Sequence, residues 1–153
     1  HPEFAFLPRK FKFSITGALN VRRHKHDALR LRDGRVLVLG GADERDNRGV
    51  YTSTEVYDPA TGRFENTAPM RLGRYKLAGT SRLMPDGQVL IASGAAQAEL
   101  YDPASGKSRI VPGDARMAGQ FAASALLPDG RVLITGGYGE GTGPRATAWV
   151  FAP

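Results

Sequence analysis

Most of the basic side chains that could bind an anion lie in three segments, each leading into a short apolar run. Guanidinium and ammonium groups bind carboxylates, sulfates and phosphates through charge-assisted hydrogen bonds. The chain carries 21 Lys and Arg against 15 Asp and Glu, a formal charge of +6, which indicates an acidic partner or a soluble basic surface. The candidate ligand-binding residues are Arg22, Arg23, His26, Arg71, Arg74, Lys76, Arg116 and Arg145. The alternative is that each arginine braces neighbouring loops by donating to backbone carbonyls.

His24 and His26 form the strongest metal-ligand pattern in the sequence. Two histidines separated by one residue on a strand point to the same side, which would supply half of a zinc-type site. The remaining histidine is His1, so a third ligand would have to be a distant carboxylate. The run Asp43–Gly49 offers oxygen ligands, but without the spacing of an EF-hand loop. We therefore assign no metal ligand.

The glycine-rich segment Gly137–Gly143 lacks the context of a phosphate-binding loop. It follows a strand-like run but leads into no helix, whereas such loops bind phosphate at a helix N-terminus. We expect a flexible loop there. The sequence contains no cysteine, which excludes disulfides and thiolate nucleophiles, and no serine elbow or Ser/His/Asp grouping stands out. We assign no catalytic residue and expect neither a cofactor nor enzymatic activity from this chain alone.

The elements that position these residues come from a repeat. The stretch Asp33–Gly41 returns as Asp86–Gly94 and Asp129–Gly137, each time as a tight turn, a short apolar strand and a glycine stop. A unit that recurs at about 45–50 residues indicates a repeat architecture. A second motif, a strand followed by an Asp-Pro turn, recurs at Glu55–Gly62 and Glu99–Gly106.

Further strands are expected on both sides of these motifs. The first strand of each unit is predicted at His26–Leu31, Leu77–Met84 and Gln120–Leu127, and the fourth strand at Arg63–Asn66 and Lys107–Val111, with Phe11–Ile15 as an N-terminal counterpart. No window shows a 3.6-residue apolar period, so we predict essentially no helix. Four antiparallel strands per unit is the sequence form of a β-propeller blade, and the predicted fold is all-β with three four-stranded blades.

The repeats resemble the kelch family, in its bacterial, galactose-oxidase-like branch. The resemblance rests on Gly40-Gly41, on Tyr57-Asp58-Pro59, on Leu127–Leu133 and on the pair Arg23-x-x-His26. The chain departs from the pattern at Ser93-Gly94, and Leu77 and Ala122 stand roughly where the family often has histidine. The match covers nearly all of 1–153 as one propeller segment, with units at approximately 9–58, 59–102 and 103–153. It implies a ring of six or seven blades.

Three blades do not close a ring, and an open row would leave apolar blade faces in water. The chain is then either part of a longer propeller, continued by additional blades, or half of a homodimer. Two three-blade halves would make a six-bladed ring with twofold symmetry. In such a ring, the Phe11–Ile15 strand could complete the blade begun by Gln120–Phe151.

The functional expectation is a non-enzymatic binding or scaffold module that uses the basic loops, with a protein or an acidic small molecule or glycan as partner. The alternative is a non-catalytic segment of a larger propeller enzyme, such as a galactose-oxidase-like oxidase or a glycan-acting protein. The resemblance implies a copper site with a cross-linked cysteine, which this cysteine-free chain cannot form.

We expect no membrane segment, since no run approaches the ~18 apolar residues needed to span a bilayer. Nucleic acid is also not expected, because only Tyr75 interleaves with the basic loops. The compartment stays open, with an extracytoplasmic location slightly favoured by the resemblance.

Overall fold

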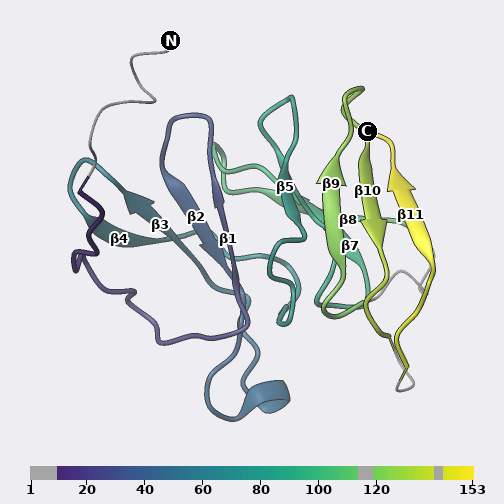
Figure 1. The fold of residues 1–153 in the computed structure, drawn as a ribbon, viewed down its shortest axis with the longest axis horizontal. Helices are drawn as coiled ribbons and strands as arrows, with labels where there is room; N and C mark the ends of the chain where they lie inside the picture. Colours follow the sequence, from purple (N-terminus) through teal and green to yellow (C-terminus); the bar gives the residue numbers. More distant parts are fainter. Residues whose placement is uncertain (1–9, 114–118, 140–142) are drawn as a thin grey trace.

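The computed structural model describes residues 10–113, 119–139 and 143–153, and it places three antiparallel sheets in a row (Figure 1). We call these sheets blades one to three. Blade one consists of β1 (Asp27–Arg30), β2 (Val36–Leu39), β3 (Thr54–Asp58) and β4 (Arg63–Thr67). Blade two consists of β5 (Ser81–Leu83), β6 (Val89–Ile91), β7 (Ala98–Tyr101) and β8 (Ser108–Val111), and blade three of β9 (Ala123–Leu126), β10 (Val132–Thr135) and β11 (Ala148–Phe151). The loop after β2 contains a 3-10 turn, η2 (Asp46–Arg48). Among the described residues, no helix is long and apolar enough to cross a membrane.

The three blades share one register, as a sequence repeat requires. Val38 pairs with Glu55 in blade one, and Ile91 pairs with Glu99 in blade two. In blade three, the same position pairs Ile134 with Trp149. The predicted all-β class and the three blade-like antiparallel sheets are therefore confirmed, and the row is not closed.

Two predictions about the outer strands are wrong. Blade three has three strands in the described residues, in the order β11-β10-β9, instead of four. Phe11–Ile15 is not a strand, because the described residues before Asn20 contain no regular structure. A strand needs a neighbour to take up its backbone hydrogen bonds, and the segment pairs with no strand in the described part of the chain.

The core lies between the blades. Alternate residues of β6 point to opposite sides: Val89 and Ile91 pack toward blade one, while Leu90 packs toward blade three. This strand is buried on both faces, which explains why its sequence is a continuous apolar run without alternation.

The glycines that end the second strands allow neighbouring blades to approach. Gly40 has a φ of +66°, and a Cβ built on it would lie 2.5 Å from the Arg74 carbonyl oxygen of blade two. The adjacent Gly41 amide donates to the same oxygen at 2.7 Å. Only glycine combines this backbone conformation with such close contact.

Figure 1 shows how the loops divide between the two ends of the blades. The Asp-Gly turns between first and second strands lie at the top of the view, and η2 lies at the bottom. We call the lower set the loop face; it contains the segments that lead into β1, β5 and β9 and the loops that follow β2, β6 and β10. The candidate basic residues belong to these loops, apart from Arg116, which lies outside the described residues.

Candidate functional site

Arg74, a predicted ligand-binding residue, is instead the centre of a buried ion pair in blade two. Its Nε lies 3.0 Å from Oε1 of Glu99, and neither side chain is exposed. The guanidinium also donates to the carbonyls of Ser93 and Gln97. Burial lowers the pKa of Arg74, and the charge of Glu99 opposes that shift. The guanidinium thus holds the loop after β6 against the segment that leads into β5.

Blade one repeats this arrangement with Arg23 and Glu55. The Arg23 Nη2 atom lies 2.9 Å from Glu55 Oε2, again with both side chains fully buried. Arg23 also donates to the carbonyls of Gly40 and Ser53, at 2.7 and 3.1 Å. Arg23 and Arg74 thus make the loop-bracing contacts that were the alternative to ligand binding, and both guanidiniums are buried inside the blades. The Arg23 Nε atom is the one donor of the two groups that has no hydrogen-bond partner among the described atoms.

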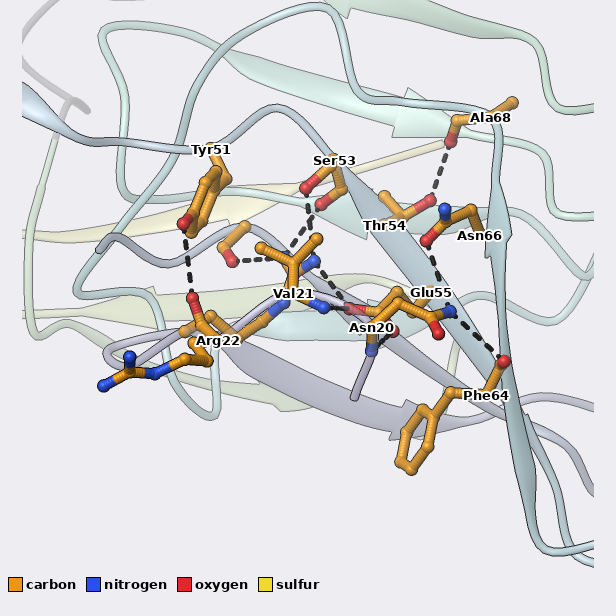
Figure 2. A network of polar contacts seen from close by, with 12 residues as sticks. Asn20, Val21, Arg22, Tyr51, Ser53, Thr54, Glu55, Phe64, Asn66 and Ala68 are labelled. Atoms are coloured by element: carbon orange, nitrogen blue, oxygen red, sulfur yellow. Dashed lines mark hydrogen bonds and ion pairs between the residues drawn. The ribbon is translucent and has the colours of Figure 1, made fainter. Parts of the chain in front are cut away.

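The glutamate of each pair has a second set of donors. Glu55 accepts the amides of Asn20 and Val21, at 2.6 and 3.3 Å, and Figure 2 shows this part of the network. Glu99 accepts the corresponding amides of Arg71 and Leu72, at 2.8 and 3.3 Å. Each carboxylate therefore fixes the segment that enters its blade.

Blade three replaces both members of the pair. Gly119 occupies the position that Arg74 has in blade two. The Gly41 amide donates to the Arg74 carbonyl, and in the next blade the Gly94 amide donates to the Gly119 carbonyl in the same way. Trp149 stands in the register position of Glu99. The Arg145 guanidinium, from the loop after β10, donates to the Gly136 carbonyl at 3.2 Å, and that carbonyl is the counterpart of the one that Arg23 binds in blade one.

The other predicted residues are dispersed over the loop face. Arg71 donates from Nε to the Ser108 carbonyl at 2.6 Å. His26 packs on Gly41 and is half-buried, and burial together with the charge of Arg23 lowers the pKa of its imidazole. Arg22 is exposed, and Figure 2 shows its side chain pointing away from the polar network. In the described residues no group of three His, Asp or Glu side chains is arranged to hold a metal ion.

Lys76 is the predicted residue around which other side chains converge. Its Nζ lies 5.0 Å from the ring centroid of Tyr75, 5.5 Å from that of Phe121 and 5.7 Å from that of Tyr138. The ammonium is also 3.3 Å from the Tyr138 hydroxyl. This hydrogen bond raises the pKa of Lys76, so the group stays cationic at all physiological pH values. We call these four residues the Lys76 cluster.

The backbone brings the cluster together by repeating one unusual conformation. Lys25, Lys76 and Phe121 hold the same place in the three segments that lead into the first strands, with φ values of 57°, 58° and 55°. The Lys76 amide donates to the Lys25 carbonyl, and the Phe121 amide donates to that of Lys76. A left-handed backbone costs a residue with a side chain about 1–2 kcal/mol. The blades therefore maintain a strained position that directs these side chains onto the loop face.

A hollow of about 360 Å³ adjoins the cluster at Tyr138. Small residues form much of its lining: Gly94, Ala95, Ala96, Gly119 and Gly139. A space of this size is at the lower end for small-molecule sites. Phe121 is 55% exposed, so an aromatic face remains open to a ligand that touches Lys76.

Reasoning from the sequence missed the three aromatic members of the cluster as site residues. The signal was available, because aligning the segments that precede the first strands puts Phe121 at the position of Lys25 and Lys76. Tyr138 comes from a different loop and could be found only from the fold. No family model matches the chain, and no curated protein is significantly similar to it.

Proposed function

We propose that this chain is a non-enzymatic binding module built from kelch-like blades, and that it takes an acidic ligand at the Lys76 cluster. The observation that carries the proposal is the convergence of one ammonium and three aromatic rings, from three different loops, beside a hollow. Kelch membership is supported by the shared register of the glycine-ended strands and Asp-Pro turns. A second copy is proposed to close the row of blades into a ring.

The composition of the cluster favours one ligand chemistry, an acidic sugar. The Lys76 ammonium can pair with a carboxylate, and its neighbour Lys25 is already paired with Asp46 at 2.6 Å. The exposed ring of Phe121 offers a flat apolar surface, against which the C–H face of a pyranose can lie. A uronate residue combines both features and is small enough for the hollow.

The proposal is tested by calorimetric titration with trigalacturonate, with neutral galactotriose as the comparison ligand. We expect the acidic trisaccharide to bind and the neutral one to bind at least tenfold more weakly. Lys76→Gln keeps the length of the side chain but removes its charge, and it should weaken binding about tenfold, which corresponds to about 1.4 kcal/mol. Phe121→Ala should weaken it by a similar factor.

Lys107→Gln is the matched control, because Lys107 is exposed in the turn that follows β7, at the opposite end of the blade. It should leave the affinity unchanged. Equal effects of Lys76→Gln and Lys107→Gln would mean that only net charge matters and would overturn the assignment. If an aspartate-rich peptide binds through Lys76 and trigalacturonate does not, the partner is an acidic protein segment.

A further inference from the structure

Three large apolar side chains project from the N-terminal segment into solvent. Phe11 is 93% exposed, Phe13 107% and Ile15 103%. They alternate with Lys12 and Ser14, so an extended chain would present all three on one face. Exposed aromatic groups in this arrangement mark a surface that another structure covers.

The segment enters blade one as an outer strand of a preceding blade would. Asn20 and Val21 donate to Glu55 as Arg71 and Leu72 donate to Glu99. When the two segments are aligned on these donors, Phe13 has the same position in the repeat as Phe64, which belongs to the outer strand β4.

The same correspondence holds beside the Asp-Pro turns. The Tyr57 hydroxyl lies 2.8 Å from the hydroxyl of Thr16. In blade two, the hydroxyl of the equivalent Tyr101 donates to the Ala68 carbonyl at 2.7 Å. In the repeat, Ala68 corresponds to the residue that follows Thr16. Residues 16–21 thus already have the position that follows an outer strand, and the segment before them is similar to β4 at two positions, with Lys12 for Arg63 and Phe13 for Phe64.

In the described residues, the sheet without an outer strand is blade three. Among the strands placed there, β11 pairs with β10 alone, so its other edge carries backbone groups without a strand partner. The outer strands of the other blades include charged residues, Arg63 and Glu65 in β4 and Arg109 in β8. By contrast, β11 reads Ala-Trp-Val-Phe. An uncharged apolar edge is one that natural proteins keep covered.

Beside this edge lies an apolar hollow of about 320 Å³ between blades two and three. Its lining includes Val111 and Ile134 together with Val150 and Phe151 of β11. Trp149 and Phe151 pack toward blade two and face this side. The Trp149 Nε1 is buried and has no hydrogen-bond partner among the described atoms, so the edge also holds an unsatisfied donor.

We propose that residues 11–15 of one copy add to β11 of a second copy as the outer, antiparallel strand of blade three. The register follows from blade one, where Tyr57 pairs with Phe64: Phe13 pairs with Phe151, Ser14 with Val150 and Ile15 with Trp149. The inference rests on the proposed pairing of two copies and identifies the segment that makes it.

This register directs each side chain to a suitable environment. Directly opposed residues of paired strands lie on the same face of a sheet. Phe13 and Ile15 therefore join Phe151 and Trp149 on the face that packs toward blade two. Ser14 lies with Val150, which is 49% exposed, on the other face.

The segment and the β11 of the same copy lie at opposite ends of the row of blades (Figure 1), so the proposal draws the strand from a second copy. Twofold symmetry makes the exchange reciprocal, so each copy gives one strand and receives one. The product is a closed assembly of six four-stranded blades with both apolar edges covered.

The test begins with the mass in solution, by analytical ultracentrifugation. The chain should sediment with twice the 16.5 kDa of one copy, and Phe13→Asp with Ile15→Lys should weaken dimerisation at least 100-fold. Lys12→Ser lies on the other face and should leave the dimer intact. A monomeric wild-type chain overturns the proposal.

A cross-link then tests the register, since the chain contains no cysteine of its own. Directly paired residues on adjacent strands are close enough for a disulfide. Under mild oxidation, Ser14→Cys with Val150→Cys should give a covalent dimer, whereas Lys12→Cys with Val150→Cys, two residues out of register, should not. A dimer that resists Phe13→Asp and gives no cross-link pairs through another surface and overturns the strand exchange. An intrachain cross-link overturns it as well. Acidic-ligand binding is judged separately, by the titration that compares Lys76→Gln with Lys107→Gln.

Discussion

Removing one member of the buried Arg74–Glu99 pair should destabilise the chain severely. Arg74→Met would leave the Glu99 carboxylate buried, with only two backbone amides as donors. Glu99→Leu would leave the guanidinium buried against two carbonyls. Breaking a fully buried ion pair at one partner costs about 3–5 kcal/mol, because the remaining charge has lost both water and its counter-charge. We expect each single substitution to lower the free energy of unfolding by that amount.

The double substitution Arg74→Met/Glu99→Leu should cost less than the two single substitutions added together. It removes both charges and leaves two amides and two carbonyls without their side-chain partners. Each of these four lost hydrogen bonds costs about 1 kcal/mol, and water can reach the backbone groups of the exposed Arg71 and Gln97. The double substitution should therefore lower the free energy of unfolding by about 2–4 kcal/mol. The two single substitutions would sum to about 6–10 kcal/mol, so the coupling energy is about 2–8 kcal/mol. Blade three offers a natural parallel, because Gly119 and Trp149 replace both partners together.

Urea unfolding, followed by circular dichroism and by the fluorescence of the single tryptophan, measures these free energies. Arg131→Met is the control, because its pair with Asp129 is about half exposed and should contribute less than about 1 kcal/mol. Two results would refute the reasoning. One is additivity of the single substitutions within about 0.5 kcal/mol; the other is a loss for Arg74→Met no larger than that for Arg131→Met.

Two further predictions concern pH and backbone contact. Burial lowers the pKa of His26, so the unfolded chain binds the proton more readily, and stability should fall as the pH drops below the unfolded value of 6.5. His26→Leu, the residue type that blade two has at this position, should flatten the decline in melting temperature between about pH 7 and pH 5; an unchanged slope would exclude His26 as its source. Gly40→Ala should cost about 2–3 kcal/mol, since the new Cβ meets the Arg74 carbonyl. Gly34→Ala, with positive φ but open space around it, should cost only about 1 kcal/mol, and equal losses in urea would contradict the contact argument.

The sequence was sufficient to predict the sheets because their signals are local. A turn, an apolar run and a glycine identify β2, β6 and β10 with little error. The first strands are less well predicted: β5 begins at Ser81 rather than at Leu77, because Gly79 has positive φ and Thr80 donates back to Leu77 in a turn. Local pattern does not show where a tight turn delays the start of a strand.

The site was harder to predict because its contacts are long-range. Arg23 and Glu55 both belong to repeated motifs, but their 32-residue separation hides the ion pair. For this reason the sequence could offer the bracing role only as an alternative to ligand binding. Tyr138 lies 62 residues from Lys76, and only the stacking of blades brings the two together. A residue type therefore indicates what chemistry is available, whereas the packing of loops decides which residue is free to perform it.

Blade three differs from the other blades at several positions, and these differences together change how the blade is stabilised. It lacks the buried pair, has Phe121 where the others have lysine, and leaves an uncharged β11 edge open. A blade without its own ion-pair brace needs stability from elsewhere, and an added outer strand supplies it through backbone hydrogen bonds and apolar contact. The Lys76 cluster spans blades two and three, so a strand that fixed blade three would also hold Phe121 and Tyr138 against Lys76. The proposed closure of the ring and order in the proposed binding site would then depend on the same blade.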